Sequence, residues 1–217
     1  MDVSIRAYDE KDRDGVRRIA CATAFLGEPC QKVVSNAEVV ADALSLYYTR
    51  YEPESCLVAE SGGKVVGYLI GTKDSRRMSR FNGKIAAVIT GKVIRYGLLF
   101  DRKNIQFIWF NFLSILKGEF RKPDHSKEYP AVIHINVDHP YRSQGIGGRL
   151  MAAFLDELRA KKIPGVRIST NTETGKQFFL KQGFHFLYSQ EQTQLRYLTK
   201  QNFTNFVYGL KLGGTNK

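Results

Sequence analysis

The feature that most constrains the fold is a strand that leads through a glycine-rich turn into a helix, within residues 134–151. Apolar and polar residues alternate up to Val137, which is typical of a β-strand, and Pro140 closes a short loop. The pattern RxxGxG follows from Arg142 to Gly147, with a further glycine at position 148. We therefore expect a strand–turn–helix unit whose backbone is accessible where the helix begins.

The same turn predicts a site for an anion. The first backbone N–H groups of a helix lack partners within the helix, and the aligned peptide dipoles place partial positive charge there. Glycines at 145, 147 and 148 leave these amides open to a phosphate. The chain has neither the GxGxxG fingerprint of dinucleotide-binding folds nor the GKS or GKT ending of a P-loop. The pattern indicates a pyrophosphate site of another kind.

Apolar periodicity and turn residues predict an alternation of strands and helices. Strands are expected over 3–8, 55–60, 64–71, 132–137, 166–170, 184–189 and 203–212. Helices are expected over 9–24, 36–51, 81–100, 105–118, 144–161 and 173–182. Such an order favours an α/β (α+β) fold built on a mixed sheet. No linker divides the chain, so we expect a single domain over residues 1–217 with an insertion at about 73–129.

Positive charge is concentrated in that insertion. Residues 73–122 contain twelve Lys or Arg and three acidic residues, which accounts for most of the formal net charge of +12. The second helix expected there is rich in aromatic residues, including Phe107, Trp109, Phe110 and Phe112. Core packing is the ordinary explanation, and a substrate tunnel, a homodimer contact or an interfacial membrane helix are alternatives. A membrane surface at about 81–122 fits better than nucleic acid, because no groove-reading element is apparent.

Cysteine usage and the termini suggest a cytoplasmic protein. The three cysteines, Cys21, Cys30 and Cys56, include no CxxC pair and do not combine with histidines at zinc-site spacing, so free thiols and no metal are expected. No signal peptide is apparent at the N-terminus. The longest apolar run, 105–116, is shorter than the roughly 20 residues that span a bilayer.

A second motif, NTETGKQFFLKQGF over residues 171–184, lies one helix and one strand beyond the glycine turn. The two motifs together resemble those of the GNAT superfamily of acyl-CoA-dependent N-acetyltransferases. The resemblance covers roughly residues 3–71 and 130–212. It implies a mixed, mostly antiparallel central sheet flanked by helices, with the central strand and the 166–170 strand splayed apart.

The resemblance also implies acetyl-CoA as the acyl donor. Pantetheine would lie between the splayed strands and pair with the backbone of Ile135, Asn136 and Val137, with the thioester carbonyl near the amide of Val137. The pyrophosphate would be held by the loop amides of Arg142, Ser143, Gln144, Gly145, Ile146, Gly147 and Gly148. Asn171 and Phe178 would border the cofactor.

The catalytic residues are less clearly indicated. The tyrosine that is frequent in the superfamily, and that can protonate the leaving thiolate, corresponds to Phe179 here, so the acid would be another residue or water. Tyr188 on the following strand is a candidate acid. His134 has a suitable intrinsic pKa for a general base and should share a strand face with Asn136, although a structural histidine is the ordinary alternative.

The leading hypothesis is an N-acetyltransferase that moves an acetyl group directly from acetyl-CoA to a primary amine of a small molecule or peptide. No cysteine is paired with a histidine to support a covalent intermediate. The basic insertion would repel polyamines and favour an acceptor with a carboxylate or phosphate. The alternatives are a catalytically silent CoA-binding regulatory or interaction module, and an acyltransferase held at a membrane surface by its insertion.

Overall fold

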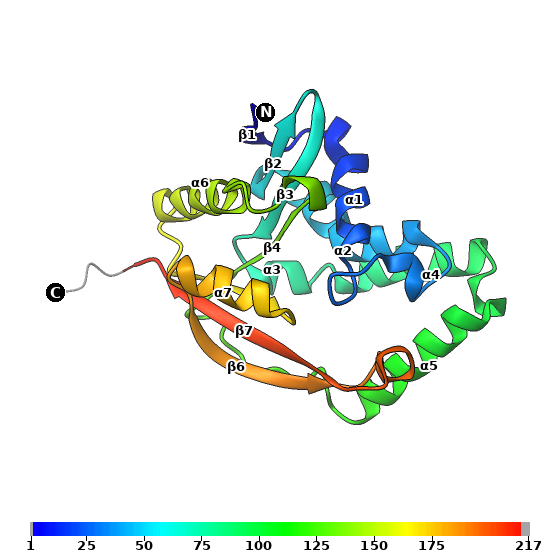
Figure 1. Ribbon diagram of the computed structural model, residues 1–217. Coiled ribbons are helices and arrows are strands. Elements are labelled where there is room, and N and C mark those ends of the chain that lie inside the picture. The colour runs from blue at the N-terminus through cyan, green and yellow to red at the C-terminus, as the bar shows by residue number, and fades with distance from the viewer. Residues whose placement is uncertain (1, 214–217) are drawn as a thin grey trace.

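The computed structural model describes residues 2–213 and shows one seven-stranded sheet in the order β1-β2-β3-β4-β5-β7-β6 (Figure 1). The strands are β1 (Ser4–Ala7), β2 (Cys56–Ser61), β3 (Lys64–Thr72), β4 (Ala131–Val137), β5 (Gly165–Thr170), β6 (His185–Gln192) and β7 (Phe203–Lys211). Neighbouring strands are antiparallel except for β4 and β5, which are parallel. The mixed, mostly antiparallel sheet confirms the predicted fold class.

Helices cover both faces of this sheet. The α-helices are α1 (Arg13–Ala22), α2 (Ala37–Tyr51), α3 (Ser75–Ser79), α4 (Asn82–Arg95), α5 (Arg102–Leu116), α6 (Ile146–Ala160), α7 (Glu173–Lys181) and α8 (Arg196–Thr199). Short 3-10 turns are η1 (Glu10–Asp12), η2 (Cys30–Lys32), η3 (Pro53–Ser55), η4 (Leu98–Phe100) and η5 (His139–Tyr141). Asn36 caps α2, since its Oδ1 accepts from the amide of Val39 at 3.2 Å.

The period-2 alternation of side chains on β3 explains the two main hydrophobic clusters. Tyr68 and Ile70 point to the face that α1 covers, where they pack with Val16. Leu69, between them, points to the opposite face and packs with Phe154 of α6. Because successive strand residues face opposite sides, a nearly continuous apolar strand can serve two cores.

The sheet opens between β4 and β5. Their parallel pairing is limited to Ala131 with Val166 and Val132 with Arg167. Residues 133–137 of β4 pair with β3 instead, over the register from Gly71 to Gly67. The two strands thus diverge toward their carboxyl ends, which confirms the expected splay and leaves one edge of β4 facing a cleft.

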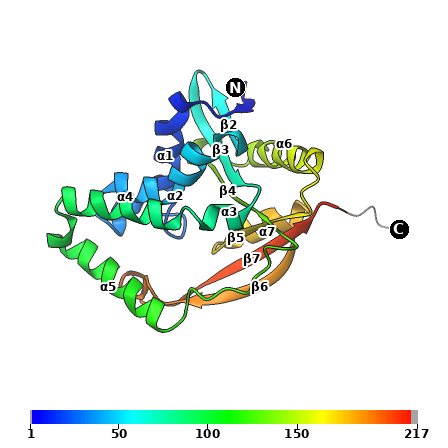
Figure 2. The ribbon, with the colours of Figure 1, turned by 180° about the vertical axis from the view of Figure 1, so that it is seen from behind.

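The 73–129 segment is mostly helical and extends to one side of the sheet (Figures 1 and 2). The helix expected over 81–100 ends earlier, at Arg95, because Gly97 adopts a left-handed conformation with φ of 61° and the chain continues as η4. Helix α3 was not predicted; Asp74 caps it by accepting from two backbone amides. An ion pair between Lys92 and the buried Asp42 ties α4 to α2.

The expectation of three free thiols is wrong. Cys21 at the end of α1 and Cys30 in η2 form a disulfide that closes the loop between them. Sequence spacing alone did not indicate this pair, because the two residues meet only when the chain reverses through a tight turn at Phe25–Glu28. Cys56 remains a free, buried thiol.

Candidate active site

A cleft of about 920 Å³ occupies the opening between β4 and β5. Its floor comes from β4, one wall from the start of α6, another from β5 and α7, and its far edge from the loop after α1. Twelve of the site residues expected from the sequence line it: His134, Ile135, Asn136, Val137, Arg142, Ser143, Gly145, Ile146, Gly147, Gly148, Asn171 and Phe178. The cleft thus brings together the two sequence motifs.

The turn between β4 and α6 is shaped by hydrogen bonds along its length. Asp138 accepts from the amide of His139 at 2.9 Å and pairs with Arg18 of α1 at 2.6 Å, so it organises the loop. Ser143 and Gly145 both have positive φ, of 62° and 76°. These two left-handed residues turn the chain so that α6 begins with its amino end at the cleft.

The start of α6 offers unpaired amides to a ligand. The first bond into the helix is from the amide of Arg149 to the carbonyl of Gly145, at 3.1 Å. The amides of residues 146–148 therefore lie before the first intrahelical acceptor. A Cβ at Gly147 would be in van der Waals contact with the Phe178 ring, at 3.4 Å. Arg142 and Lys181 add positive charge to the lining, so the residues present fit a pyrophosphate.

Two expected residues lie outside the cleft lining. Gln144 turns back on its own loop, where its Nε2 donates to the carbonyl of Pro140 at 3.1 Å. Tyr188 of β6 stacks on His125, with ring centroids 5.5 Å apart, and burial raises the pKa of its hydroxyl. The structure therefore does not bring Tyr188 to His134. Position 179 holds a buried phenyl ring, so no hydroxyl is available there.

A buried polar network supports the floor of the cleft. Tyr68 Oη lies 3.0 Å from His134 Nδ1 and accepts from Asn136 Nδ2 at 2.9 Å. With the Oη proton directed to Nδ1, the neutral imidazole would carry its own proton on Nε2. Sequence reasoning missed Tyr68, because its role depends on the β3–β4 register that sets it opposite Asn136.

Burial decides the charge of this histidine. It lowers the pKa of His134 from 6.5 to about 4, since the protonated ring would lose solvation. The imidazole is consequently neutral at physiological pH. Burial also raises the pKa of Tyr68 well above its usual value, so the phenol remains a hydrogen-bond donor.

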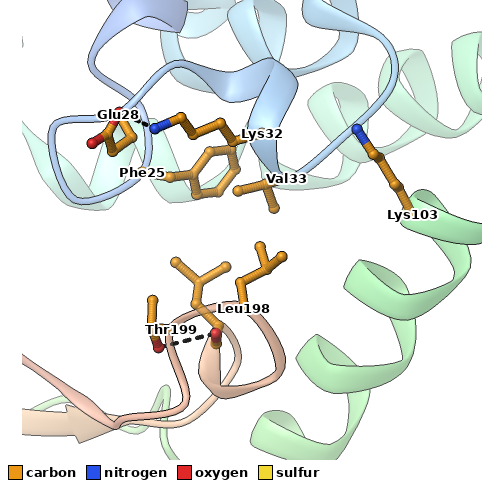
Figure 3. A pocket seen from close by; sticks show the side chains of 8 residues that line it. Phe25, Glu28, Lys32, Val33, Lys103, Leu198 and Thr199 are labelled. Carbon is orange, nitrogen blue, oxygen red and sulfur yellow. Dashed lines mark hydrogen bonds and ion pairs between the residues drawn. The ribbon is translucent and has the colours of Figure 1, made fainter.

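A second cavity of about 510 Å³ lies beside the cleft, across the loop that follows α1 (Figure 3). Its walls come from that loop, from α8 with the residue before it, and from α5. Phe25, Val33, Leu195 and Leu198 supply apolar surface, and Lys103 of α5 stands at one side. Residues 24, 26 and 27 of the same loop line the first cleft, so the two spaces share one wall.

Comparison with known proteins places these features in a family. The profile of the acetyltransferase (GNAT) family matches residues 28–184. No curated protein sequence matches significantly. Among solved structures, the chain resembles that titled SsHAT, for which no organism is given, with 21% identity, a TM-score of 0.66 and coverage of 99% of this chain and 100% of that one.

Two further structures show the same fold at lower identity. The Salmonella typhimurium protein yncA, a putative acetyltransferase solved with acetyl-CoA, has 14% identity and a TM-score of 0.58, with 100% of this chain and 98% of that chain covered. A polyamine N-acetyltransferase of Drosophila melanogaster that forms N-acetylagmatine has 14% identity and a TM-score of 0.58, with 97% and 100% covered. With the family profile spanning both motifs and the splayed strands between them, the chain belongs to the acetyltransferase (GNAT) family.

Proposed function

We propose that this acetyltransferase transfers the acetyl group of acetyl-CoA directly to a primary amine of an acceptor that also carries a carboxylate or phosphate. The acceptor is a small molecule or the end of a peptide. The observation that supports this choice is the second cavity, where Lys103, without an ion-pair partner among the described residues, stands beside apolar walls. The donor is that of the family, and the acceptor is the new part of the proposal.

The second cavity is suited to an acceptor with an apolar body and a negative group. Phe25 and Leu198 face each other across it, while Lys103 lies at its edge (Figure 3). Within residues 2–213, Lys103 has no ion-pair partner, whereas Lys32 is already paired with Glu28 at 2.7 Å. A cationic acceptor would meet repulsion from Lys103, and a carboxylate or phosphate would be attracted.

The cysteines support direct transfer over a covalent intermediate. Cys21 and Cys30 are joined to each other, and Cys56 is only 1% exposed, with a pKa that burial raises to about 12. A protonated, enclosed thiol is neither a nucleophile nor within reach of substrate. No activated cysteine is therefore present among the described residues.

His134 is better suited to donate a hydrogen bond than to remove a proton. A base with a pKa of about 4 is poorly matched to an alkylammonium group. The Nε2–H, held by the contact of Nδ1 with Tyr68, can donate to an oxygen on which negative charge develops. Acetyl-CoA supplies the activated thioester carbonyl, and in this proposal water takes the proton of the amine and protonates the thiolate.

The acceptor class can be tested with amines of matched size but different charge. Three groups of amines would be compared: agmatine and spermidine, arylalkylamines with no charge besides the amine, and amines that bear a carboxylate or phosphate. For each amine, thiol release from acetyl-CoA and the mass of the product would be measured. We expect the last group to have the highest kcat/KM, and the value to fall with added salt. Lys103→Glu should reverse the preference, and Arg102→Glu, the adjacent residue outside the cavity lining, is the matched control.

Two results would contradict the proposal. Agmatine or spermidine as the best substrate of the wild-type protein would exclude an anionic acceptor. Tight acetyl-CoA binding in calorimetry without thiol release for any amine would favour the alternative of a CoA-binding module.

A further inference from the structure

Helix α5 carries an exposed apolar face. Its residues recur at intervals of three or four, at Ile105, Ile108, Trp109, Phe112, Ile115 and Leu116. At about 100° per residue they fall within an arc of about 120° and extend for about 16 Å along the helix. Trp109 is 55% exposed and Leu116 is 68% exposed. We call these six residues the α5 stripe.

The opposite face of α5 contacts the rest of the protein. Phe107 packs edge-on against Phe25, with ring centroids 5.7 Å apart, and Phe110 stacks on Tyr197 at 4.8 Å. Asn104 Nδ2 donates to Ser35 Oγ at 2.7 Å. Core packing therefore explains one face of the helix and leaves the α5 stripe unexplained.

The turn that precedes α5 extends the apolar surface. Phe100 of η4 is 91% exposed, and Leu99 beside it is also exposed. In both views this turn lies at the margin of the molecule, on the side away from α6 (Figures 1 and 2). A flat surface could reach it without obstruction from α6.

Positive charge stands at both ends of the α5 stripe. Arg102 and Lys103 precede it, Lys117 and Arg121 follow it, and all four side chains belong to exposed residues. The nearby acids are engaged: Asp101 caps α5, and Glu119 accepts from the amide and hydroxyl of Thr193. Lys117 lies 3.9 Å from Glu119 Oε1, whereas Arg102, Lys103 and Arg121 have no ion-pair partner within residues 2–213. An apolar face bordered by exposed cations is the pattern of a helix that lies at an anionic lipid surface.

We propose that the α5 stripe docks on the surface of an anionic membrane, with Trp109 and Phe112 in the interface and the flanking Lys and Arg on lipid head groups. The helix would lie in the plane of the surface. No helix within residues 2–213 is long and apolar enough to cross a bilayer. Apart from Lys103, which also lines the second cavity, the residues that carry this inference are not those that support the acceptor proposed above.

Charge argues for a membrane over a second copy of this chain. Because both ends of the stripe are basic, pairing of two α5 helices would oppose like charges whether the helices were parallel or antiparallel. The formal charge of +12 on each copy adds to that repulsion. An anionic lipid surface instead satisfies both ends at once.

The chain contains its own reporter, because Trp109 is its only tryptophan. Full-length protein would be titrated with vesicles of phosphatidylcholine alone and of phosphatidylcholine with 30% phosphatidylglycerol, while Trp109 emission and co-sedimentation are measured. We expect a blue shift and binding with the anionic vesicles, weakened by 0.5 M NaCl, and quenching by lipids brominated on their acyl chains. About 30% anionic lipid gives the vesicle a negative surface potential, and about 0.5 M salt screens its attraction for the basic side chains.

Variants distinguish vesicle binding by the α5 stripe from nonspecific hydrophobic binding elsewhere on the protein. Ile108→Ser with Phe112→Ser keeps the reporter and should lower vesicle affinity at least tenfold, as should Arg102→Glu with Lys117→Glu. Phe186→Ser is the matched control, because Phe186 of β6 is 52% exposed but lies outside the stripe, and it should bind as wild type. Thermal unfolding would establish that each variant is folded.

Three results would overturn the proposal. Binding that is equal for the stripe variant and wild type would place the contact elsewhere, and the absence of any blue shift with anionic vesicles would exclude insertion of Trp109. A lipid-free dimer in sedimentation equilibrium that Ile108→Ser with Phe112→Ser dissociates would assign the stripe to a second copy of the chain.

Discussion

The two ends of the cleft are built in different ways. The end that fits the pyrophosphate comes from one continuous stretch, residues 137–148, and works through backbone amides at the start of α6. The end proposed to hold the reacting groups combines Tyr68 of β3 with His134 and Asn136 of β4 through side-chain contacts. Beyond it, the second cavity adds walls from the loop after α1, from α5 and from α8.

The two ends should therefore differ in how well they tolerate amino-acid substitutions. A backbone cradle depends on small residues and on the helix start, so it is sensitive to any added side chain. A side-chain network depends on the identity of a donor or acceptor, so a substitution that keeps the relevant group can be tolerated. Substitutions at the two ends of the cleft should therefore differ in their effects.

The largest effect is expected at the backbone cradle. Gly147→Glu would place a side chain against Phe178 and a negative charge beside the pyrophosphate. Two negative charges about 5 Å apart, at an effective dielectric constant of about 20, repel each other by about 3 kcal/mol. This corresponds to a loss in acetyl-CoA affinity of about a hundredfold. Calorimetric titration measures it. Ala152→Glu, at an exposed position on the same helix, is the control. Equal acetyl-CoA affinities for the two variants would show that the start of α6 does not bind the pyrophosphate.

A smaller effect is expected at the reacting end. If His134 donates through Nε2, His134→Ala should lower kcat about thirtyfold, or about 2 kcal/mol, with little change in the KM for acetyl-CoA. His134→Gln, whose amide can donate from a similar place, should recover a large part of that loss. His134 would instead be the general base if two results were found together. The Gln variant would be as inactive as the Ala variant, and kcat would fall at low pH in the wild type but not in the variants.

The smallest effect concerns stability and pH. A histidine whose pKa is about 4 when folded and about 6.5 when unfolded favours folding fully above pH 6.5 and loses that contribution as the pH falls toward 4. Between pH 7 and pH 5 the loss is about 1.5 kcal/mol for a residue that partly faces the cleft. Urea unfolding of wild type and His134→Gln at both pH values measures it. The same pH dependence in both proteins would show that His134 titrates normally.

The elements that follow from short-range patterns were predictable from the sequence. The Gly62–Gly63 hairpin, the Asn36 cap and the left-handed Gly183 after α7 are each decided by residues within a few positions of one another. The Gly97 stop was missed, and with it the early end of α4, because an isolated glycine can be either tolerated in a helix or used to end it. The Cys21–Cys30 disulfide could not be predicted from the spacing of the cysteines in the sequence, because the two residues meet only through the turn at Phe25–Glu28.

The mixed sheet, the family motifs and the glycine turn at the start of α6 follow from the amino-acid sequence, since a helix start and its glycines are local properties of a continuous chain. The contact of Tyr68 with His134, the position of Tyr188 outside the cleft, and the two aromatic faces of α5 became apparent only in the folded protein. Those facts depend on strand register and on which surfaces meet across long sequence separations. A sequence records which residues are apolar or ionisable, but burial and partners, which decide what those residues do, arise only when the chain is folded.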